Sequence, residues 1–323
     1  MRRYSIVQVV NVLLSAVILC SCNGNTAGND TSQPTTETDT SLTIMFTGDV
    51  LLDRGVRPVI EHRGIDHVFA DVAPLFARAD AVVINLECPL TDSRSPLGKQ
   101  FIFRAEPSWA EGLRRAGITH AAMANNHTND QGRTGISDTY RHLQTAGITP
   151  LGYGENHEQR HEPVVIERGN VKVALFNAAM MTMENWHLRP DRTDIWQPTD
   201  DELVGVVEAY REANPSTKII CVLHWGVEFQ SMPNRQQRIL AHRLSRVGVD
   251  AVVGHHPHVL QPIEVINDRT IVYYSLGNFV FDQHPPLTRQ SMIACLTLSA
   301  DSIIHTETKI EISGCVPKQM QGN

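Results

Sequence analysis

The sequence predicts an α/β domain in which two β-sheets pack face to face and helices cover their outer faces. Short apolar runs alternate with helical patterns over the first two thirds of the chain, and consecutive strands without helices follow. The apolar runs hold few polar residues, and such strands need cover on both faces of their sheet. About 280 residues remain beyond the N-terminal segment, which suits one large domain.

The expected elements follow from this alternation. Strands are predicted at residues 42–46, 80–86, 118–124, 171–177, 218–223 and 250–253. Helices are predicted at residues 66–78, 108–116, 135–146, 200–213 and 235–247. Residues 180–199 are expected to form an irregular insertion. The C-terminal part predicts strands at residues 263–266, 270–275, 291–298 and 303–312.

The first 41 residues have the composition of an export signal followed by a tether. Arg2 and Arg3 precede a mostly apolar run at residues 6–19, which suits a signal-peptide core and is short for a membrane span. The run ends at Leu19-Cys20-Ser21-Cys22, which resembles a bacterial lipobox. We expect a signal peptide at residues 1–21, lipidation of Cys22, a disordered polar tether at residues 22–41 and a single domain at residues 42–315. The alternative is an uncleaved N-terminal anchor.

Composition argues against one class of partner. The 323 residues are 41% hydrophobic and 20% charged, with a net charge of −7, so the basic character of a nucleic-acid-binding protein is missing. The four cysteines beyond residue 22 lie far apart and form no CxxC pair, and they suggest no function. The chain also holds 15 histidines, and their positions are informative.

Polar side chains of the kinds that bind metals stand at the carboxyl ends of five expected strands. They are Asp49, Glu87, Asn126 with His127, His224, and His255 with His258. In open α/β sheets, ligands bind outside the carboxyl ends of the strands. Carboxylate, amide oxygen and imidazole together suit one or two divalent ions of Mn, Fe, Zn or Mg. Each residue alone has an ordinary structural explanation, such as a helix cap or a turn, but the repetition favours a common site.

Six motifs occur in an order that resembles a known family. They are Phe46-Thr47-Gly48-Asp49, Asn85-Leu86-Glu87, Ala124-Asn125-Asn126-His127, His224-Trp225-Gly226, Gly254-His255-His256-Pro257-His258 and Tyr274-Ser275-Leu276-Gly277-Asn278-Phe279. They resemble the CapA/PgsA-type capsule synthesis family, associated with poly-γ-glutamate, over about residues 42–285. That family is similar in fold to the calcineurin-like metallophosphoesterases. The resemblance therefore implies a metallophosphoesterase-like sandwich of two mixed β-sheets flanked by helices.

The resemblance also implies roles for individual residues. The implied metal ligands are Asp49, Glu87 at the bridging position, Asn126, His224, and the final pair His255 and His258. Asn126 and His127 match the catalytic Gly-Asn-His element, with His127 beside the leaving group. Arg104 resembles a position that binds a phosphate or carboxylate of the substrate; a surface ion pair is its ordinary alternative.

Two departures from the metallophosphoesterase pattern leave the function open. Leu51 stands where those enzymes carry a metal-binding histidine, and Glu87 replaces their bridging aspartate. One hypothesis is a metal-dependent hydrolase, a phosphoesterase or amide hydrolase, which acts on an anionic polymer or a small anionic substrate. The other is a non-catalytic factor for polymer binding, export or attachment. Both place the protein in the cell envelope, with the membrane and capsule-synthesis membrane proteins as partners.

Overall fold

A computed structural model describes residues 41–320 of the chain. The predicted signal peptide, the predicted lipidation site Cys22 and all of the predicted tether except residue 41 lie outside the described residues. Among the helices within the described range, none is both long enough and apolar enough to cross a membrane.

The larger sheet has eight strands and contains the first strands of the domain. Its order is β16-β15-β14-β1-β2-β3-β4, and β13 pairs with β1. Strands β1 to β4 are parallel to one another, whereas β14 runs antiparallel to β1. The strands are β1 (Leu42–Val50), β2 (Ala81–Leu86), β3 (His120–Ala122), β4 (Thr149–Leu151), β13 (Asn278–Val280), β14 (Gln290–Leu298), β15 (Ile303–Ser313) and β16 (Val316–Gln319).

The smaller sheet has six strands in the order β11-β12-β10-β9-β7-β6. Its four central strands are parallel, and an antiparallel strand lies at each edge. The strands are β6 (Val164–Arg168), β7 (Val171–Ala179), β9 (Lys218–His224), β10 (Ala251–His255), β11 (Ile263–Ile266) and β12 (Thr270–Tyr273). A two-stranded sheet pairs β5 (Tyr153–Gly154) with β8 (Asp194–Ile195), and β8 lies inside the predicted insertion.

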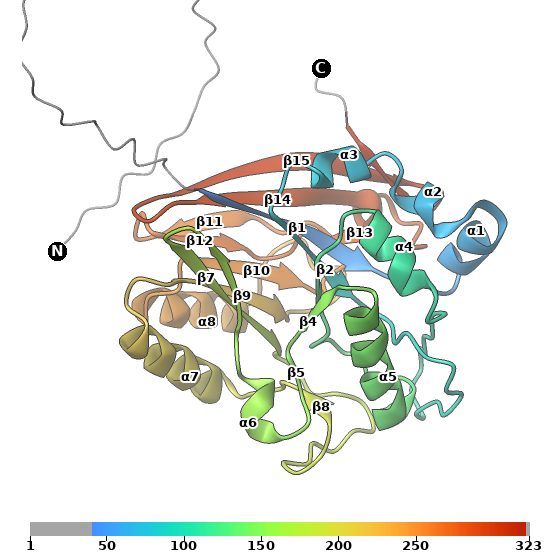
Figure 1. The fold of residues 1–323 in the computed structure, drawn as a ribbon, viewed down its shortest axis with the longest axis horizontal. Coiled ribbons are helices and arrows are strands. Elements are labelled where there is room, and N and C mark those ends of the chain that lie inside the picture. The colour runs from blue at the N-terminus through green and yellow to red at the C-terminus, as the bar shows by residue number, and fades with distance from the viewer. Residues whose placement is uncertain (1–40, 321–323) are drawn as a thin grey trace, which may run out of the picture.

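Helices cover the outer face of each sheet. Figure 1 shows α7 and α8 beside the smaller sheet, and α1, α2, α4 and α5 on the other side of the molecule. The helices are α1 (Val56–Arg63), α2 (Ile65–Phe69), α3 (Ala73–Phe76), α4 (Trp109–Arg115), α5 (Gly132–Thr145), α6 (His157–Arg160), α7 (Asp200–Ala213), α8 (Arg235–Arg246) and the 3-10 helix η1 (Pro286–Arg289).

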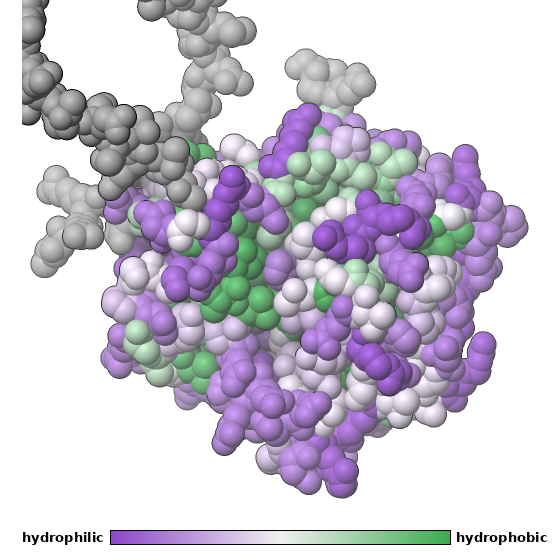
Figure 2. Space-filling model, viewed as in Figure 1, coloured by the Kyte–Doolittle hydropathy of each residue, from purple (hydrophilic) through white to green (hydrophobic). Residues whose placement is uncertain are grey.

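Three apolar cores hold these layers together. Successive side chains of a strand point to opposite faces of the sheet and so join different cores. In β9, Ile220 and Val222 join the core between the two sheets, whereas Cys221 and Leu223 join the core beneath α7 and α8. A third core lies between the larger sheet and helices α1 to α5. Figure 2 shows hydrophilic residues over most of the viewed face, with apolar residues in smaller areas. The predicted two-sheet sandwich with outer helices is confirmed.

Several elements differ from the prediction. The helix expected at residues 66–78 is broken into α2 and α3, and Pro74 lies in the first turn of α3. Proline suits a first helical turn and removes a hydrogen bond inside a helix, so a continuous helix was the wrong prediction. Helix α1 and the short strands β4, β6, β13 and β16 were not predicted. The sheet also continues past the predicted domain end at residue 315, because β16 pairs with β15.

Two glycines allow strands that carry the predicted ligands to approach other backbone segments closely. A Cβ on Gly48 would lie 2.1 Å from the carbonyl oxygen of Gly277, and the Asp49 N–H donates to that oxygen at 2.9 Å. A Cβ on Gly254 would lie 2.1 Å from the carbonyl oxygen of Tyr274. Glycine therefore sets the positions of Asp49 and His255 relative to the loop that leads into β13.

We expect Gly48→Ala to destabilise the fold by about 1–3 kcal/mol or more, because the new methyl group meets rigid backbone rather than a flexible side chain. Gly205→Ala is the matched control: a Cβ there, within α7, meets nothing within 4 Å, and alanine favours the helix by about 0.5–1 kcal/mol. Urea denaturation of both variants measures these changes. An unchanged midpoint for Gly48→Ala would contradict the close approach described here.

Candidate metal centre

The carboxyl ends of parallel strands bring three predicted ligands into one buried group. Asp49 is the next-to-last residue of β1, Glu87 directly follows β2, and His258 lies three residues after the end of β10. One ligand atom from each of these residues lies within 4.8 Å of the other two, and all three side chains are buried. His258 Nδ1 is 3.2 Å from Asp49 Oδ2, and His258 Nε2 is 3.7 Å from Glu87 Oε1. The two sheets thus contribute to one cluster.

His224 and Asn126 complete this cluster on the other side of Glu87. His224 Nε2 lies 2.8 Å from Asn126 Oδ1 and 3.9 Å from Glu87 Oε1. Their predicted ligand atoms therefore face each other directly. Glu87 Oε1 therefore lies within 4 Å of a ring nitrogen of both His224 and His258.

Unlike the other predicted ligands, His255 directs its Nε2 to a backbone carbonyl. Its Nε2 lies 2.9 Å from the backbone carbonyl of Thr47 and donates a hydrogen bond to it. This bond ties β10 of the smaller sheet to β1 of the larger one. The structure therefore brings Asp49, Glu87, Asn126, His224 and His258 together, whereas His255 Nε2 is occupied by backbone.

The Glu87 carboxylate is the observation that tests whether these residues fit a metal ion. Neither of its oxygens has a hydrogen-bond partner within the described residues, although the side chain is completely buried. Burying a carboxylate without a partner is costly, and a divalent cation would satisfy both oxygens. The surrounding donors are carboxylate and amide oxygens with several imidazoles, which suits Zn, Mn or Fe better than Mg. The donor set fits a divalent ion.

The electrostatics of the cluster favour a bound cation. Burial and the neighbouring charge of Asp49 raise the pKa of Glu87 well above its usual value. Burial alone would raise the pKa of Asp49 as well, but the hydrogen bond and the charge of His258 lower it. Burial works against a charged His258, yet Glu87 and Asp49 raise its pKa to about 9. The two carboxylates therefore favour a positive charge beside them.

Two asparagines that the prediction did not include orient the ligands. Asn85 Nδ2 donates to Asp49 Oδ1 at 2.9 Å and lies 3.4 Å from His224 Nδ1. Asn278 Oδ1 lies 2.9 Å from His258 Nδ1. Such outer partners set the direction in which a ligand's coordinating atom points. Asn85 and Asn278 were visible in the sequence within motifs, but an asparagine in a motif gives no sign of which neighbour it contacts.

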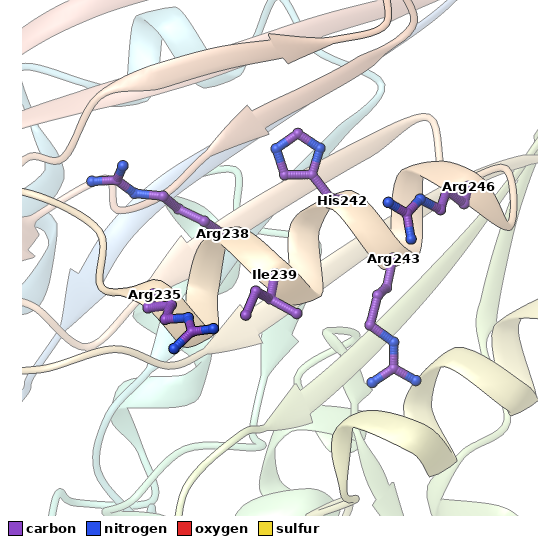
Figure 3. A pocket seen from close by; sticks show the side chains of 6 residues that line it. All are labelled: Arg235, Arg238, Ile239, His242, Arg243 and Arg246. Carbon is purple, nitrogen blue, oxygen red and sulfur yellow. The ribbon is translucent and has the colours of Figure 1, made fainter.

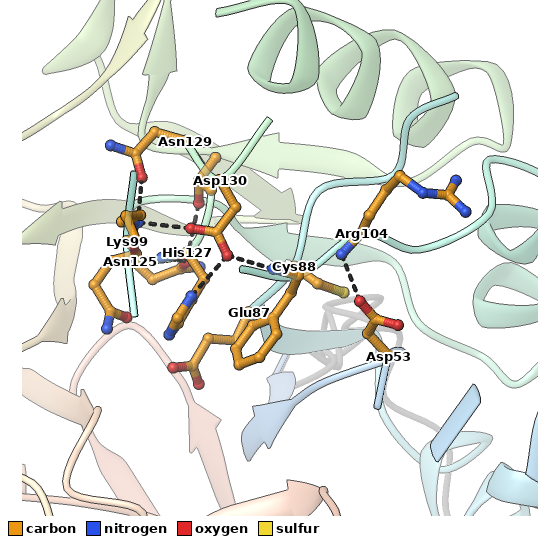
Figure 4. Close-up of polar contacts among 12 residues, drawn as sticks. Asp53, Glu87, Cys88, Lys99, Arg104, Asn125, His127, Asn129 and Asp130 are labelled. Carbon is orange, nitrogen blue, oxygen red and sulfur yellow. Dashed lines mark hydrogen bonds and ion pairs between the residues drawn. The ribbon is translucent and has the colours of Figure 1, made fainter. Parts of the chain in front are cut away.

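His127 is held by an ion-pair network that sequence reasoning missed. Its Nδ1 donates to Asp130 Oδ2 at 2.8 Å, and its ring lies 4.1 Å from that of Phe103, centroid to centroid. Lys99 Nζ donates to Asp130 Oδ1 at 2.6 Å and to Asn129 Oδ1 at 2.7 Å (Figure 4). Burial lowers the pKa of His127 although Asp130 acts to raise it. Among the described residues, His127 Nε2 has no hydrogen bond.

Arg104 is not brought to this cluster. Its guanidinium donates to Glu106 Oε1 at 2.6 Å and to the Thr91 carbonyl at 2.9 Å. Figure 4 shows the guanidinium pointing away from Glu87, while the backbone N–H of Arg104 donates to Asp53. The Arg104 side chain therefore forms an ion pair, which was the alternative to the predicted substrate-binding role.

The fold is shared with two solved nucleotidases at low sequence identity. A 5'-nucleotidase precursor from Thermus thermophilus aligns with a TM-score of 0.52 and 15% identity, over 86% of this chain and 55% of that one. The NAD nucleotidase NadN of Haemophilus influenzae aligns with a TM-score of 0.51 and 11% identity, over 87% of this chain and 60% of that one. At these identities the likeness establishes the metallophosphoesterase-like fold alone.

Relatives at higher identity define the family. The "PGA biosynthesis protein CapA" of Bacillus subtilis is 32% identical over 89% of this chain and 76% of its own length. The "Capsule biosynthesis protein CapA" of Bacillus anthracis is 30% identical, and the match covers 78% of this chain and 62% of that protein. The family described as "Bacterial capsule synthesis protein PGA_cap" matches residues 43–283, a range that includes every predicted metal ligand. This chain therefore belongs to the bacterial capsule synthesis protein family PGA_cap.

Proposed function

We propose that the protein acts in the synthesis of a poly-γ-glutamate-type capsule, as a metal-dependent hydrolase of an anionic surface polymer or its precursor. The observation that carries this proposal is the buried Glu87 carboxylate, whose two oxygens have no donor within the described residues. The capsule role is supported by family membership and by the printed names of the Bacillus relatives. The hydrolytic role is supported by the site geometry.

The cluster offers a place for the metal and for the substrate. Asp49, Glu87, Asn126, His224 and His258 would hold the ion, and a bound divalent ion would polarise the scissile bond and make water more acidic. A neighbouring cavity of about 300 Å³ is lined by residues that include Asn126, His127 and Glu228. A substrate in that cavity would lie next to the cluster.

His127 is the residue that would exchange a proton with the substrate. Asp130 fixes the proton of the imidazole on Nδ1, so Nε2 carries the free lone pair when the ring is neutral. Burial lowers the pKa of His127, which keeps Nε2 unprotonated near neutral pH. Nε2 can therefore accept a proton and pass it to a leaving group. Asp130 and Lys99 act as positioning residues for this ring.

We expect metal-loaded protein to hydrolyse phosphoesters or γ-glutamyl amides, and His127→Asn to lower kcat by about 10²–10⁴-fold. The metal content of this variant should stay at the wild-type level, because His127 lies outside the proposed ligand set. His305→Asn, a substitution on the remote strand β15, is the matched control. Turnover assays with elemental analysis of each protein check this. A metal-loaded wild type that cleaves neither bond class would rule out the hydrolase.

A non-catalytic polymer-binding role is the second candidate, and helix α8 favours it. Basic side chains project from its outer face and border a surface hollow of about 620 Å³ (Figure 3). They are Arg235, Arg238, His242, Arg243 and Arg246. Arg243 is paired with Asp201 at 2.6 Å, whereas among the described residues Arg235, Arg238 and Arg246 form no ion pair. Three guanidinium groups that have no acidic partner among the described residues, on a protein of net charge −7, would attract a polycarboxylate.

The double variant Arg235→Gln, Arg246→Gln should bind poly-γ-glutamate several-fold more weakly than wild type, and added salt should reduce the difference. Arg63→Gln with Arg78→Gln is the control, because it removes two exposed arginines elsewhere and changes the net charge equally. Binding is measured by interferometry on immobilised polymer at two salt concentrations. Equal losses in both double variants would mean that net charge, and not α8, governs binding.

We further propose that the protein is attached to the cell envelope through a lipid on Cys22. The motif Leu19-Cys20-Ser21-Cys22 supports this, and so does the capsule role of the family. Cys22→Ser should move the protein from the membrane fraction to the soluble fraction of the expressing cells. Cys20→Ser is the control. Membrane retention of the Cys22→Ser protein would favour an uncleaved N-terminal anchor instead.

A further inference from the structure

We propose that a basic cavity at the amino ends of the strands of the smaller sheet binds a phosphate group. The cavity has a volume of about 390 Å³, and the metal cluster lies at the opposite ends of β9 and β10. In β9, the first residue, Lys218, lines the cavity, and the last residue, His224, belongs to the metal cluster. At about 3.3 Å per residue, these two positions lie about 20 Å apart. The cavity is therefore separate from the proposed metal centre.

Positive charge gathers around this cavity although the whole protein is negative. Four parallel strands of the smaller sheet, β7, β9, β10 and β12, begin here, and each has a charged residue within one position of its start. The charged lining residues are Lys172, Arg211, Lys218, Arg269, Asp250 and Asp301. Four cations and two carboxylates leave an excess of two positive charges on a protein of net charge −7, although Lys172 also pairs with Glu167 at 2.9 Å. Such a local excess favours an anionic ligand.

Two guanidinium groups of this lining lie side by side. Arg211 Nη2 and Arg269 Nη2 both donate to the Gly248 carbonyl, at 2.8 Å and 3.2 Å. A Cβ on Gly248 would lie 3.0 Å from Arg269 Nη2 and 3.1 Å from Arg211 Nε, so glycine allows both groups to lie against this backbone. Two like charges this close repel each other, and an oxyanion that accepts from both would offset the repulsion.

The buried carboxylate of the lining leaves donors of these two arginines unused. Asp250 Oδ2 accepts from Arg211 Nη2 at 2.9 Å and from the Ile219 N–H at 2.8 Å. Within the described residues, Arg211 Nε is buried without a hydrogen bond, and Arg269 forms no ion pair. The Arg269 guanidinium carries several N–H donors, and its hydrogen bond within the described residues goes to the Gly248 carbonyl. A phosphate group presents more acceptor oxygens than a carboxylate does, so it is better able to accept from both arginines at once.

The place of the cavity in the fold favours a phospholipid headgroup as the source of the phosphate. Residues 299–301 line the cavity and directly follow β14, and the last residue of that strand, Leu298, pairs with Leu42 at the start of β1. The cavity therefore lies at the end of the domain that the chain enters from the segment with Cys22. This source rests on the proposed lipid at Cys22, which would keep that end near anionic headgroups, whereas the phosphate site itself does not.

The test measures binding to the metal-stripped full-length protein in detergent by isothermal titration calorimetry. The probes are inorganic phosphate, glycerophosphoglycerol, which is the headgroup of phosphatidylglycerol, and glutarate as a dicarboxylate. We expect Arg269→Gln and Arg211→Lys to bind the phosphate probes about tenfold or more weakly than wild type. Lysine at residue 211 keeps the charge and removes the Nε donor. Arg168→Gln is the matched control, because it removes one charge from an exposed arginine that pairs with Asp80 outside the cavity.

Tighter binding of glycerophosphoglycerol than of inorganic phosphate would assign the site to a lipid headgroup, and the reverse order to a soluble phosphate; either order supports the phosphate site. Wild type that binds neither phosphate probe, tighter binding of glutarate, or binding that Arg269→Gln and Arg211→Lys leave unchanged would overturn it. So would an equal loss in Arg168→Gln, since net charge would then govern binding. The thermal midpoint of each variant shows whether the fold is retained. The Cys22→Ser fractionation tests the lipid separately, because neither of its results changes phosphate binding to the cavity.

Discussion

The Glu87 carboxylate is completely buried, and no donor within the described residues reaches either of its oxygens. Its neighbours are arranged differently: Asn85 donates to Asp49, and Asp49 and Asn278 hold one nitrogen of His258. Hydrogen bonds therefore serve the groups around Glu87 and leave Glu87 itself facing two imidazoles. A divalent cation would offset the cost of burying this carboxylate, and the polar network therefore fits a metal centre.

The packing of the two sheets makes this cluster possible. Parallel strands of both sheets end on the same side of the molecule, and the core between the sheets fixes their separation. The hydrogen bond from His255 to the Thr47 carbonyl crosses from one sheet to the other, and Gly48 lets the backbone before β13 approach β1. The positions of the ligands thus depend on apolar packing and on backbone contacts far from any metal.

Much of the fold was accessible from sequence because its signals are local. Helix α7 has the predicted bounds, and α8 ends one residue before its predicted end; both begin with a side-chain cap, Thr199 for α7 and the Asn234–Gln237 capping box for α8. Elements that lack such signals were missed or misjudged, among them the pair α2 and α3 and the short strands β4, β6, β13 and β16. A strand of a few residues has too little periodicity to identify, and it forms because a neighbouring strand offers hydrogen bonds.

The sequence alone determined which residue types stand at the strand ends, because apolar runs mark the strands and their ends mark the rim of the sheet. It therefore indicated a site of carboxylates, amides and imidazoles. Only the tertiary structure decided which atoms face one another: His255 turns to a backbone carbonyl, Arg104 to Glu106, and His256 with Glu228 toward the cluster. These directions depend on backbone dihedrals and on contacts between segments that meet only in the folded chain, such as Thr47 and His255, which a local sequence pattern does not contain.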